Sequence, residues 1–558
     1  MTPLDNPTTS TQAGKANEVA GIDPTVTTTE FLAAGSRGLF DSERTRVLIG
    51  LAVLLVFRVG YLALCPMELI PDEAYYWDWS RRLDWSYYSK PPMIAALIAL
   101  STALSGDSEF AVRLPATILG TLGLWGVYEL GRRMYGHRVG AWSMLMVAVA
   151  PGTTVLCLLM TIDAPFICAW TFATYCLWRM LEPDRVNGAW VIPAILATGA
   201  GLLSKQTTLG LYPLVGLFLI STRSQYSKLR SPWIWAWSAG SLAFLVPVVW
   251  WNARHDWITV AHTGSHFGIT PRSLTQRLIS YLEFVVSQSG ILSPLIFCLL
   301  CVATIALMLT YSNLGNRERF LTCFCGIPLA AITVLSLWQR VQPNWPVALY
   351  LTGVVIVAAW KCGEISLSLR LDRLRILVVP AISLGCVMSM AVAVVPFLLP
   401  SSRLAGTRFD FTGRLRGWKA TGTLIAARLQ EIEATGDLLL IAATARAPVS
   451  ELAYYLPGRP RVYRWNVGEV IDSQHDIWGG PIDGKGRDAL IVTEDDAEVP
   501  VRLTQAFASI EDLGKVIVPL GSTKSRQFRI WRGACFSDWP RRRTQESLAT
   551  RALQSQFD

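Results

Sequence analysis

The stretch RVLIGLAVLLVFRVGYLALCP, residues 46–66, opens a series of long apolar runs. An α-helix of about 20 mostly apolar residues crosses a bilayer, and this stretch is long enough. A shorter run at 93–105 predicts an interfacial or re-entrant helix. The long runs predict eleven spans, at residues 46–66, 111–130, 140–159, 163–180, 188–203, 207–221, 232–251, 289–311, 319–338, 346–361 and 376–399.

The composition of the whole chain also indicates a polytopic membrane protein. Of the 558 residues, 52% are hydrophobic and only 16% are charged. Soluble domains carry about 25% charged residues, so the composition excludes a single soluble domain and a disordered chain. The eleven cysteines lie mostly in apolar runs and form no paired metal motif, so they predict no metal or redox role.

Basic residues in the loops predict the orientation. Lys and Arg collect in cytoplasmic loops, and a cytoplasmic N-terminus makes every predicted cytoplasmic loop basic. This rule accounts for the net charge of +9 without a nucleic-acid partner. An odd number of spans then places the C-terminal part outside the cytoplasm. The loop residues are Arg132, Arg133, Arg138, Arg179, Arg185, Arg223, Lys228, Arg230, Arg317, Arg319, Lys361, Arg370, Arg373 and Arg375.

Changes in composition along the chain predict four parts. Residues 1–42 form a flexible cytoplasmic tail, 43–400 the membrane domain, 401–540 a small extracytoplasmic α/β domain and 541–558 a polar tail. In the third part, short apolar runs bounded by Gly and Pro predict strands, and SELAYYL and VRLTQAF have helical spacing. The predicted strands are residues 437–443, 461–465, 488–493 and 515–520.

The segment PDEAYYWDWSRRLDWSYYSKPP, residues 71–92, has the densest group of chemically active side chains. Asp72 and Glu73 directly follow a span, where carboxylates are costly unless they face a polar cavity. Asp72 and Glu73 are therefore candidate catalytic residues, and Tyr88 and Lys90 of the same segment are candidate substrate ligands. The aromatic residues have a second interpretation, as an interfacial belt at the headgroups.

Other polar residues lie between apolar runs on the same predicted side. Asp163, in LLMTIDAPFICAW, is a candidate catalytic residue, although Asp also caps helices. Lys205, in GLLSKQT, is a candidate substrate ligand, or a lysine that snorkels to the interface. The turn WQRVQPNWP adds Arg340 and Asn344 as candidate substrate ligands.

Carboxylates and cations at an outer membrane surface suit transfer of a sugar from a polyprenyl phosphate. Phosphate leaves readily, and cations such as Lys90 or Arg340 would stabilise its developing charge. One carboxylate would deprotonate the attacking hydroxyl, and direct displacement would invert the anomeric centre. The predicted partners are a lipid-linked sugar donor, membrane lipids and an envelope glycan, lipid or protein acceptor.

These motifs resemble the glycosyltransferase 39 and protein O-mannosyltransferase-like superfamily. Asp72–Glu73 and Lys90-Pro91-Pro92 are similar to the family's first external loop, although Ser89 stands where the aminoarabinose transferases of lipid A have Glu. Asp163 resembles the second external Asp of the family. The likeness extends over about residues 45–535, and includes VQPNWP, RLRGW, ELAYYLPGRPRVYRWN and DALIVT.

The resemblance implies a GT-C fold of about 11–13 transmembrane helices with external amphipathic helices. It implies Asp72 as the base, and Lys90 as a ligand of the donor phosphate or of a carboxylate on the sugar. It also implies a bacterial inner membrane and a periplasmic C-terminal domain. The members include lipid A and lipopolysaccharide transferases.

Neither a cofactor nor a metal is predicted. His262 and His266 have helical i,i+4 spacing, but Gly264 and Gly268 weaken a helix there, and His255 completes no ligand set. A solvated loop is the preferred interpretation of this segment.

Two other classes of function compete with the enzyme. A transporter or flippase for a lipid-linked sugar would place charges at the bilayer midplane, often in two repeated halves, whereas here the charges lie at span ends and no repeat is visible. A non-catalytic receptor would leave the acidic first loop without a role.

Overall fold

A computed structural model describes residues 42–265, 272–408, 410, 412–433, 438–466, 471–521 and 523–539. The N-terminal tail (except Ser42), the polar tail 541–558 and His266 therefore lie outside the described residues. The chain divides into two compact units, Met1–Gly50 and Leu51–Asp558, and every candidate site residue belongs to the second.

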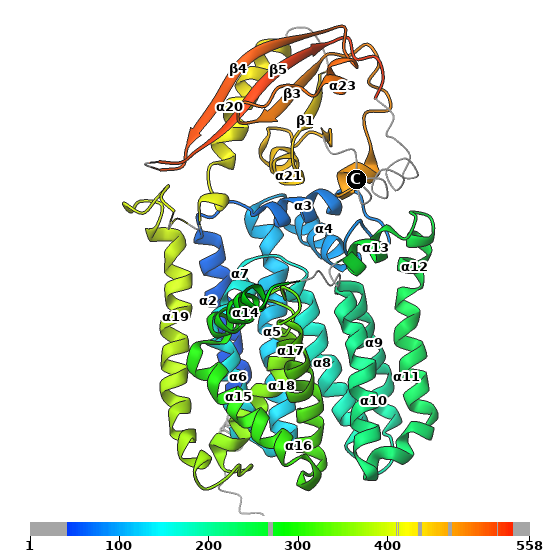
Figure 1. Cartoon of the computed structure of the whole chain (residues 1–558), viewed down its shortest axis with the longest axis vertical. Coiled ribbons are helices and arrows are strands. Elements are labelled where there is room, and N and C mark those ends of the chain that lie inside the picture. The colour runs from blue at the N-terminus through cyan, green and yellow to red at the C-terminus, as the bar shows by residue number, and fades with distance from the viewer. Residues whose placement is uncertain are drawn as a thin grey trace, which may run out of the picture. The chain divides into compact units, whose positions relative to one another are not determined.

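Each predicted span is occupied by one helix or by consecutive helical segments (Figure 1). This confirms the polytopic α-helical fold class. These helices are α2 (Glu43–Leu64), α5 (Glu109–Tyr135), α6 (His137–Ala148), α7 (Pro151–Leu158), α8 (Asp163–Leu181), α9 (Val191–Ser204), α10 (Leu211–Ser221), α11 (Pro232–Leu242), α12 (Val246–Ala253), α14 (Leu274–Leu292), α15 (Pro294–Leu309), α16 (Asn316–Leu321), α17 (Ile327–Leu335), α18 (Val347–Cys362) and α19 (Val378–Leu398).

Length and composition alone allow fewer spans than the sequence predicts. Among the described residues, five helices are long and apolar enough to cross a bilayer, and up to seven if each bent pair is one span. The bends measure 68° between α6 and α7 and 109° between α14 and α15. Pro151 and Pro294 begin the second helix of each pair, and proline disfavours the α conformation in the residue before it. Three predicted spans, α9, α10 and α18, are shorter apolar helices.

Short helices connect these elements. The first loop contains α3 (Pro71–Ser80), and the run at 93–105 forms α4 (Met93–Ser105). Proline at the first position of α3 suits a helix start, because the missing N–H has no partner inside the helix. Other short elements are η1 (Gly188–Trp190), η2 (Gln206–Gly210), η3 (Arg223–Arg230), η4 (Ala243–Leu245), α13 (Ile258–Ser265), η5 (Tyr311–Asn313), the π-helical η6 (Thr322–Gly326), η7 (Leu371–Leu377) and η8 (Gly413–Leu415).

The C-terminal part contains a five-stranded sheet in the order β2-β1-β3-β5-β4. β1 pairs in parallel with β2 and β3, while β5 lies antiparallel between β3 and β4. All five residues of β1 are buried, as expected of a central parallel strand. The elements are α20 (Trp418–Glu433), β1 (Leu439–Ala443), α21 (Arg446–Tyr455), β2 (Val462–Arg464), α22 (Gln474–Trp478), β3 (Ala489–Glu494), α23 (Val501–Thr504), β4 (Ser509–Pro519) and β5 (Ser525–Ala534).

The structure refines the predicted elements of this part. The four predicted strands are present as β1, β2, β3 and β4, but β4 begins earlier, at Ser509. β5 was not predicted, because SRQFRIWRGA alternates charged and apolar residues without a bounded apolar run. VRLTQAF forms only the single helical turn of α23.

The C-terminal sheet and the first loop share one hydrophobic core. A single buried cluster joins Tyr75 and Trp79 of α3 to Val449 of α21 and to Leu440 and Val492 of the sheet. In Figure 1, α3 and α4 accordingly lie between the helical bundle and the sheet. This packing brings residues more than 350 positions apart in sequence to the start of α3.

Candidate active site

Helix α3 carries the adjacent carboxylates Asp72 and Glu73 in its first turn. Successive residues of a helix point about 100° apart, so the two side chains face different surroundings. The positive end of the helix dipole favours both negative charges. One short helix therefore supplies two carboxylates with separate environments.

Glu73 is completely buried and fully engaged. Its carboxylate accepts from Arg113, with Nη2 to Oε2 at 2.7 Å and Nε to Oε1 at 2.9 Å. The backbone amides of Ile70 and Met160 also donate to it, at 3.0 Å and 2.8 Å. The Arg113 side chain is itself only 1% exposed. Glu73 therefore joins α3 to α5 and to the segment before α8, and none of its surface is open to a substrate.

Asp72 lies at the surface of the site instead. Its Oδ1 accepts from Nη2 of Arg446 at 2.8 Å, and both side chains are nearly half exposed. Arg446 is the first residue of α21 and stacks on the Tyr75 ring, with its Cζ 4.8 Å from the ring centroid. The C-terminal part of the chain thus supplies the partner of the first-loop carboxylate.

Asp163 and Lys205 form a second, mostly buried ion pair. Nζ of Lys205 lies 2.7 Å from Oδ1 of Asp163, and Nδ2 of Asn344 donates to Oδ2 at 2.7 Å. Asp163 begins α8, Lys205 directly follows α9, and Asn344 precedes α18. Three of the predicted site residues therefore meet at the ends of three different helices.

Lys90 lies beside this pair. Its Nζ makes neither a hydrogen bond nor an ion pair with any residue that the structure describes. Burial and the charge of Lys205 lower the pKa of Lys90, while Asp163 and Asp72 act in the opposite direction. Asp72 and Asp163 also raise the pKa of the buried Tyr76, after the larger effect of burial. The charges of Asp72 and Asp163 therefore act on the same two side chains, Lys90 and Tyr76.

Two of the predicted ligands lie apart from this group. The Arg340 side chain is 73% exposed and pairs with Glu283, with Nε to Oε2 at 3.1 Å. Tyr88 packs its ring on His262 at 4.7 Å, and its backbone N–H donates to Oε1 of Gln474 at 2.7 Å. Among the described residues, neither makes a hydrogen bond or an ion pair with Asp72, Lys90 or Asp163. The structure therefore joins Asp163, Lys205 and Asn344 directly, and leaves Arg340 and Tyr88 at other positions.

The aromatic residues of the first loop have structural roles of two kinds. Trp79 is completely buried and stacks on Tyr87 at 4.3 Å, whereas Trp85 is mostly exposed. Trp77 is also buried, and its Nε1 donates to Asp107 at 2.7 Å. Trp77 and Trp79 therefore belong to the core between α3 and α21 and not to a headgroup belt.

The histidines of the 252–265 segment make local contacts. His255 stacks on Trp251 at 3.9 Å, and its Nδ1 lies 2.8 Å from the Trp251 carbonyl oxygen. His262 packs against Tyr88, as described above. In the described part of the chain, no three His, Cys, Asp or Glu residues gather as metal ligands would.

Sequence reasoning missed two residues of the site. Arg113 interrupts the run EFAVRLPATIL, and a cation inside an apolar helix is a signal for a buried partner. Arg446 carries no such signal, because ATARAPV resembles any polar connection after a strand. Only the packing of α21 on α3 reveals that Arg446 reaches Asp72.

Comparison with known proteins identifies similar chains. The family model described as dolichyl-phosphate-mannose-protein mannosyltransferase matches residues 89–251. Lipid A galacturonosyltransferase RgtD of Rhizobium johnstonii is 27% identical over 350 residues, which cover 61% of this chain and 71% of that protein.

Solved structures share the fold. The crystal structure of ArnT from Cupriavidus metallidurans bound to undecaprenyl phosphate matches with a TM-score of 0.59 at 17% identity, over 87% of this chain and 97% of that one. The apo form of the same protein matches with a TM-score of 0.57 at 16% identity, over 87% and 98% of the two chains. The helical bundle with a C-terminal sheet is therefore a known architecture.

Proposed function

We propose that the chain is a PMT-like glycosyltransferase that moves a sugar from a polyprenyl-phosphate donor to an envelope acceptor, with inversion at the anomeric carbon. Its similarity to the PMT family model and to RgtD, and the fold that it shares with ArnT, support this proposal. The observation that carries the proposal is Lys90, a half-buried cation that has no ion pair with any described residue, although the charges of Asp163, Lys205 and Asp72 act on it. Lys205 pairs with Asp163, and the charge of Lys90 adds a second ammonium group to this region, which suits an anionic ligand.

Each residue has a role in the proposed reaction. Lys90 and Lys205 bind the donor phosphate, and Asp163 with Asn344 holds Lys205 in position. The acceptor hydroxyl oxygen bonds to the anomeric carbon as the bond from that carbon to the phosphate oxygen breaks. The phosphate leaves with the electron pair, and Asp72 takes the hydroxyl proton. We assign Glu73 to positioning α3, because both of its oxygens are occupied.

The related proteins support the donor and acceptor classes. The ArnT crystal structure contains undecaprenyl phosphate, which is the carrier part of such a donor. RgtD is named for lipid A, so lipid A or lipopolysaccharide is the first acceptor to test, ahead of other glycans and proteins.

We place the protein in the bacterial inner membrane with a cytoplasmic N-terminus and a periplasmic C-terminal domain. The support is that the basic loops and α3 belong to opposite ends of the helices. In Figure 1, α16, which contains Arg317 and Arg319, lies at the end of the bundle opposite to α3.

A transfer assay in proteoliposomes tests the proposal. Wild type and Asp72→Asn are compared with a panel of polyprenyl-phosphate sugars, and loss of the base costs about a hundredfold to ten-thousandfold in rate. Asp84→Asn is the matched control, since this first-loop carboxylate accepts from Trp251 Nε1 at 2.7 Å and lies outside the proposed chemistry. Equal activity of wild type and Asp72→Asn contradicts the role of Asp72, and donor that only changes leaflet favours a flippase.

A further inference from the structure

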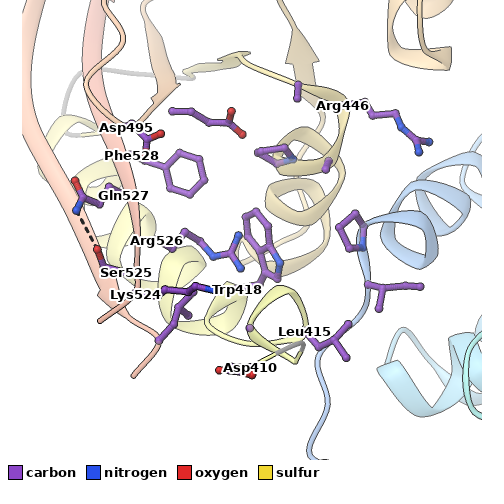
Figure 2. Close-up of a pocket in the computed structure, with 18 of the residues that line it drawn as sticks. Asp410, Leu415, Trp418, Arg446, Asp495, Lys524, Ser525, Arg526, Gln527 and Phe528 are labelled. Carbon is purple, nitrogen blue, oxygen red and sulfur yellow. Dashed lines mark hydrogen bonds between the residues drawn. The ribbon is translucent and has the colours of Figure 1, made fainter. Parts of the chain in front are cut away.

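A large cleft lies between the C-terminal sheet and the start of α3. Its volume is about 1070 Å³, and it is open to solvent along one side. β5, the N-termini of α20 and α21, and the segment before α3 form its walls (Figure 2). Asp72 and Arg446 lie on one wall, and Lys524, Arg526 and Gln527 on another.

The sheet topology explains why polar residues gather there. β1 and β3 are parallel neighbours, so their carboxyl ends lie at the same edge. Arg446 follows β1, and Glu494 with Asp495 ends and follows β3. Ligands of α/β sheets bind outside the carboxyl ends of parallel strands, so the cleft occupies a favourable position for binding.

Several polar groups of the cleft have no partner within the part of the chain that the structure describes. Nζ of Lys524 and the carboxylate of Asp495 make no hydrogen bond or ion pair with any residue that the structure describes. Nε of Arg526 is buried and has no acceptor among the described residues, whereas its Nη2 donates to the Arg416 carbonyl at 3.0 Å. Arg526 also stacks on Trp418, with its Cζ 3.5 Å from the ring centroid. Figure 2 shows Lys524, Arg526 and Trp418 gathered between β5 and α21.

Asp72 connects this cleft to the Asp163 group. It lines the cleft directly, and its charge acts on Lys90 and Tyr76 together with that of Asp163. A ligand held by Lys524 and Arg526 would therefore extend toward the same carboxylate that faces the donor phosphate from the other direction.

We propose that this cleft binds the anionic saccharide headgroup of the acceptor. Lys524 and Arg526 bind its phosphate or carboxylate groups, since guanidinium and ammonium groups form strong charge-assisted hydrogen bonds with such anions. Asp495 and Gln527 accept and donate hydrogen bonds to its hydroxyls, and one hydroxyl is presented to Asp72. This inference rests on the proposed function, because it names the acceptor of that reaction.

Kinetics of the full-length enzyme in proteoliposomes test the assignment. Lys524→Ala and Arg526→Ala should each raise the acceptor KM about tenfold to a hundredfold and leave the donor KM unchanged. Arg526→Lys keeps the positive charge but loses the stacked guanidinium group, so its acceptor KM should be intermediate. It replaces Arg526→Ala in the test if that variant fails to fold. Arg529→Ala is the control, because Arg529 is on the same strand but binds Asp512, with Nη2 to Oδ2 at 2.6 Å, and does not line the cleft. Unchanged acceptor KM in Lys524→Ala and Arg526→Lys overturns the proposal.

Calorimetry without donor separates this inference from the reaction. The probes are a bisphosphorylated glucosamine disaccharide, a uronic-acid disaccharide and an uncharged glucosamine-derived disaccharide with acetylated amines. Tighter binding of either acidic probe than of the uncharged one, weakened by Lys524→Ala, supports the cleft and names the anion. Equal binding of all three, or binding of none, overturns it. If no donor sugar is transferred but acidic probes bind in this way, the proposed reaction fails while the cleft assignment stands.

Discussion

Two charged clusters flank the start of α3 and differ in how completely they are paired. The Glu73 cluster consists of Glu73, Arg113 and the amides of Ile70 and Met160, with one carboxylate for one guanidinium. The Asp163 cluster consists of Asp163, Lys205, Asn344 and Lys90, with one carboxylate for two ammonium groups.

The difference separates a structural ion pair from a binding site. A buried charge is tolerated when its hydrogen bonds and its counter-charge are supplied by the protein, as for Glu73. The Asp163 cluster lacks one negative charge, and a donor phosphate would supply it. A cation left without a partner is therefore more informative about function than burial alone.

Breaking the Glu73 cluster should have the largest effect, and on folding. Glu73→Gln leaves Arg113 as an uncompensated buried charge, which costs about 3–5 kcal/mol of stability. Thermal unfolding in detergent should show a much lower transition temperature, with activity falling in proportion to the folded fraction. Asp72→Asn is the matched control, because Asp72 is half exposed and its loss should leave the transition unchanged. A folded but inactive Glu73→Gln protein would instead make Glu73 part of the chemistry.

Changes to the Asp163 cluster should affect activity next most strongly, and non-additively. Lys205→Met leaves Asp163 with only Asn344, and Asp163→Asn leaves Lys205 without its counter-ion. Each should lower kcat/KM by at least about tenfold, and the double variant should lose less than the product of the two losses, with a coupling of about 0.5–3 kcal/mol. Measured kcat/KM values for the four proteins give the coupling. Strict additivity would show that the pair does not act as a unit.

Lys90 should give the enzyme a distinctive dependence on pH. Donor phosphate needs the protonated ammonium, and the pKa of Lys90 is lowered, first by burial and then by Lys205. The charge is therefore lost at a lower pH than in an ordinary lysine, and kcat/KM for the donor should fall there as the pH rises. Lys90→Arg should move this alkaline limb upward, because arginine stays charged.

The control for this profile is Lys419→Arg, an exposed lysine that pairs with Glu109. It should leave the pH profile of wild type unchanged. An alkaline limb that Lys90→Arg does not move would assign the ionisation to another group.

Much of this architecture could be predicted from the sequence, because the apolar length that a membrane-spanning helix needs is a property of its own segment. An apolar run such as 46–66 specifies a helix from its own residues, and residues at the same-side ends of spans must lie at one surface. That reasoning predicts that Asp163, Lys205 and Asn344 lie near one another, and the structure joins them directly. It could not separate Asn344 from Arg340, four residues earlier, because the direction of a side chain in a turn depends on tertiary packing.

The partners of the first-loop acids could not be predicted in the same way. Arg446 reaches Asp72 across 374 positions, through the packing of α21 on α3. Because Asp72 and Glu73 are adjacent, the sequence predicts one shared role for both carboxylates. The helix, however, directs them to different environments. Residue type alone predicts a catalytic role for both Asp72 and Glu73. The burial and the ion pair of each carboxylate distinguish their proposed roles.

The last prediction, with the smallest expected effect, concerns Glu451 of α21. It tests how a buried carboxyl group without a hydrogen-bond partner among the described residues affects stability. The Glu451 side chain is fully buried, and neither carboxylate oxygen has a hydrogen-bond partner among the described residues. Burial raises its pKa well above the usual range; Arg526 and Arg113 oppose this shift, and Glu73 and Glu68 add to it. The carboxyl therefore remains protonated in the folded state at a pH where the unfolded chain is ionised.

The sign of the pH dependence follows from that raised pKa. The contribution of Glu451 to stability is complete below the pKa of the unfolded carboxyl and is lost as the pH rises toward the pKa of the folded one. Glu451→Gln removes this loss, so it should unfold about 2–4 °C above wild type near pH 8, the shift that about 1 kcal/mol gives a medium-sized domain. The difference should shrink toward pH 5, whereas Glu431→Gln, which replaces an exposed carboxylate, should show no such trend. Parallel profiles for Glu451→Gln and wild type would mean that Glu451 ionises in the folded protein, and that a buried carboxylate here needs no cation of its own.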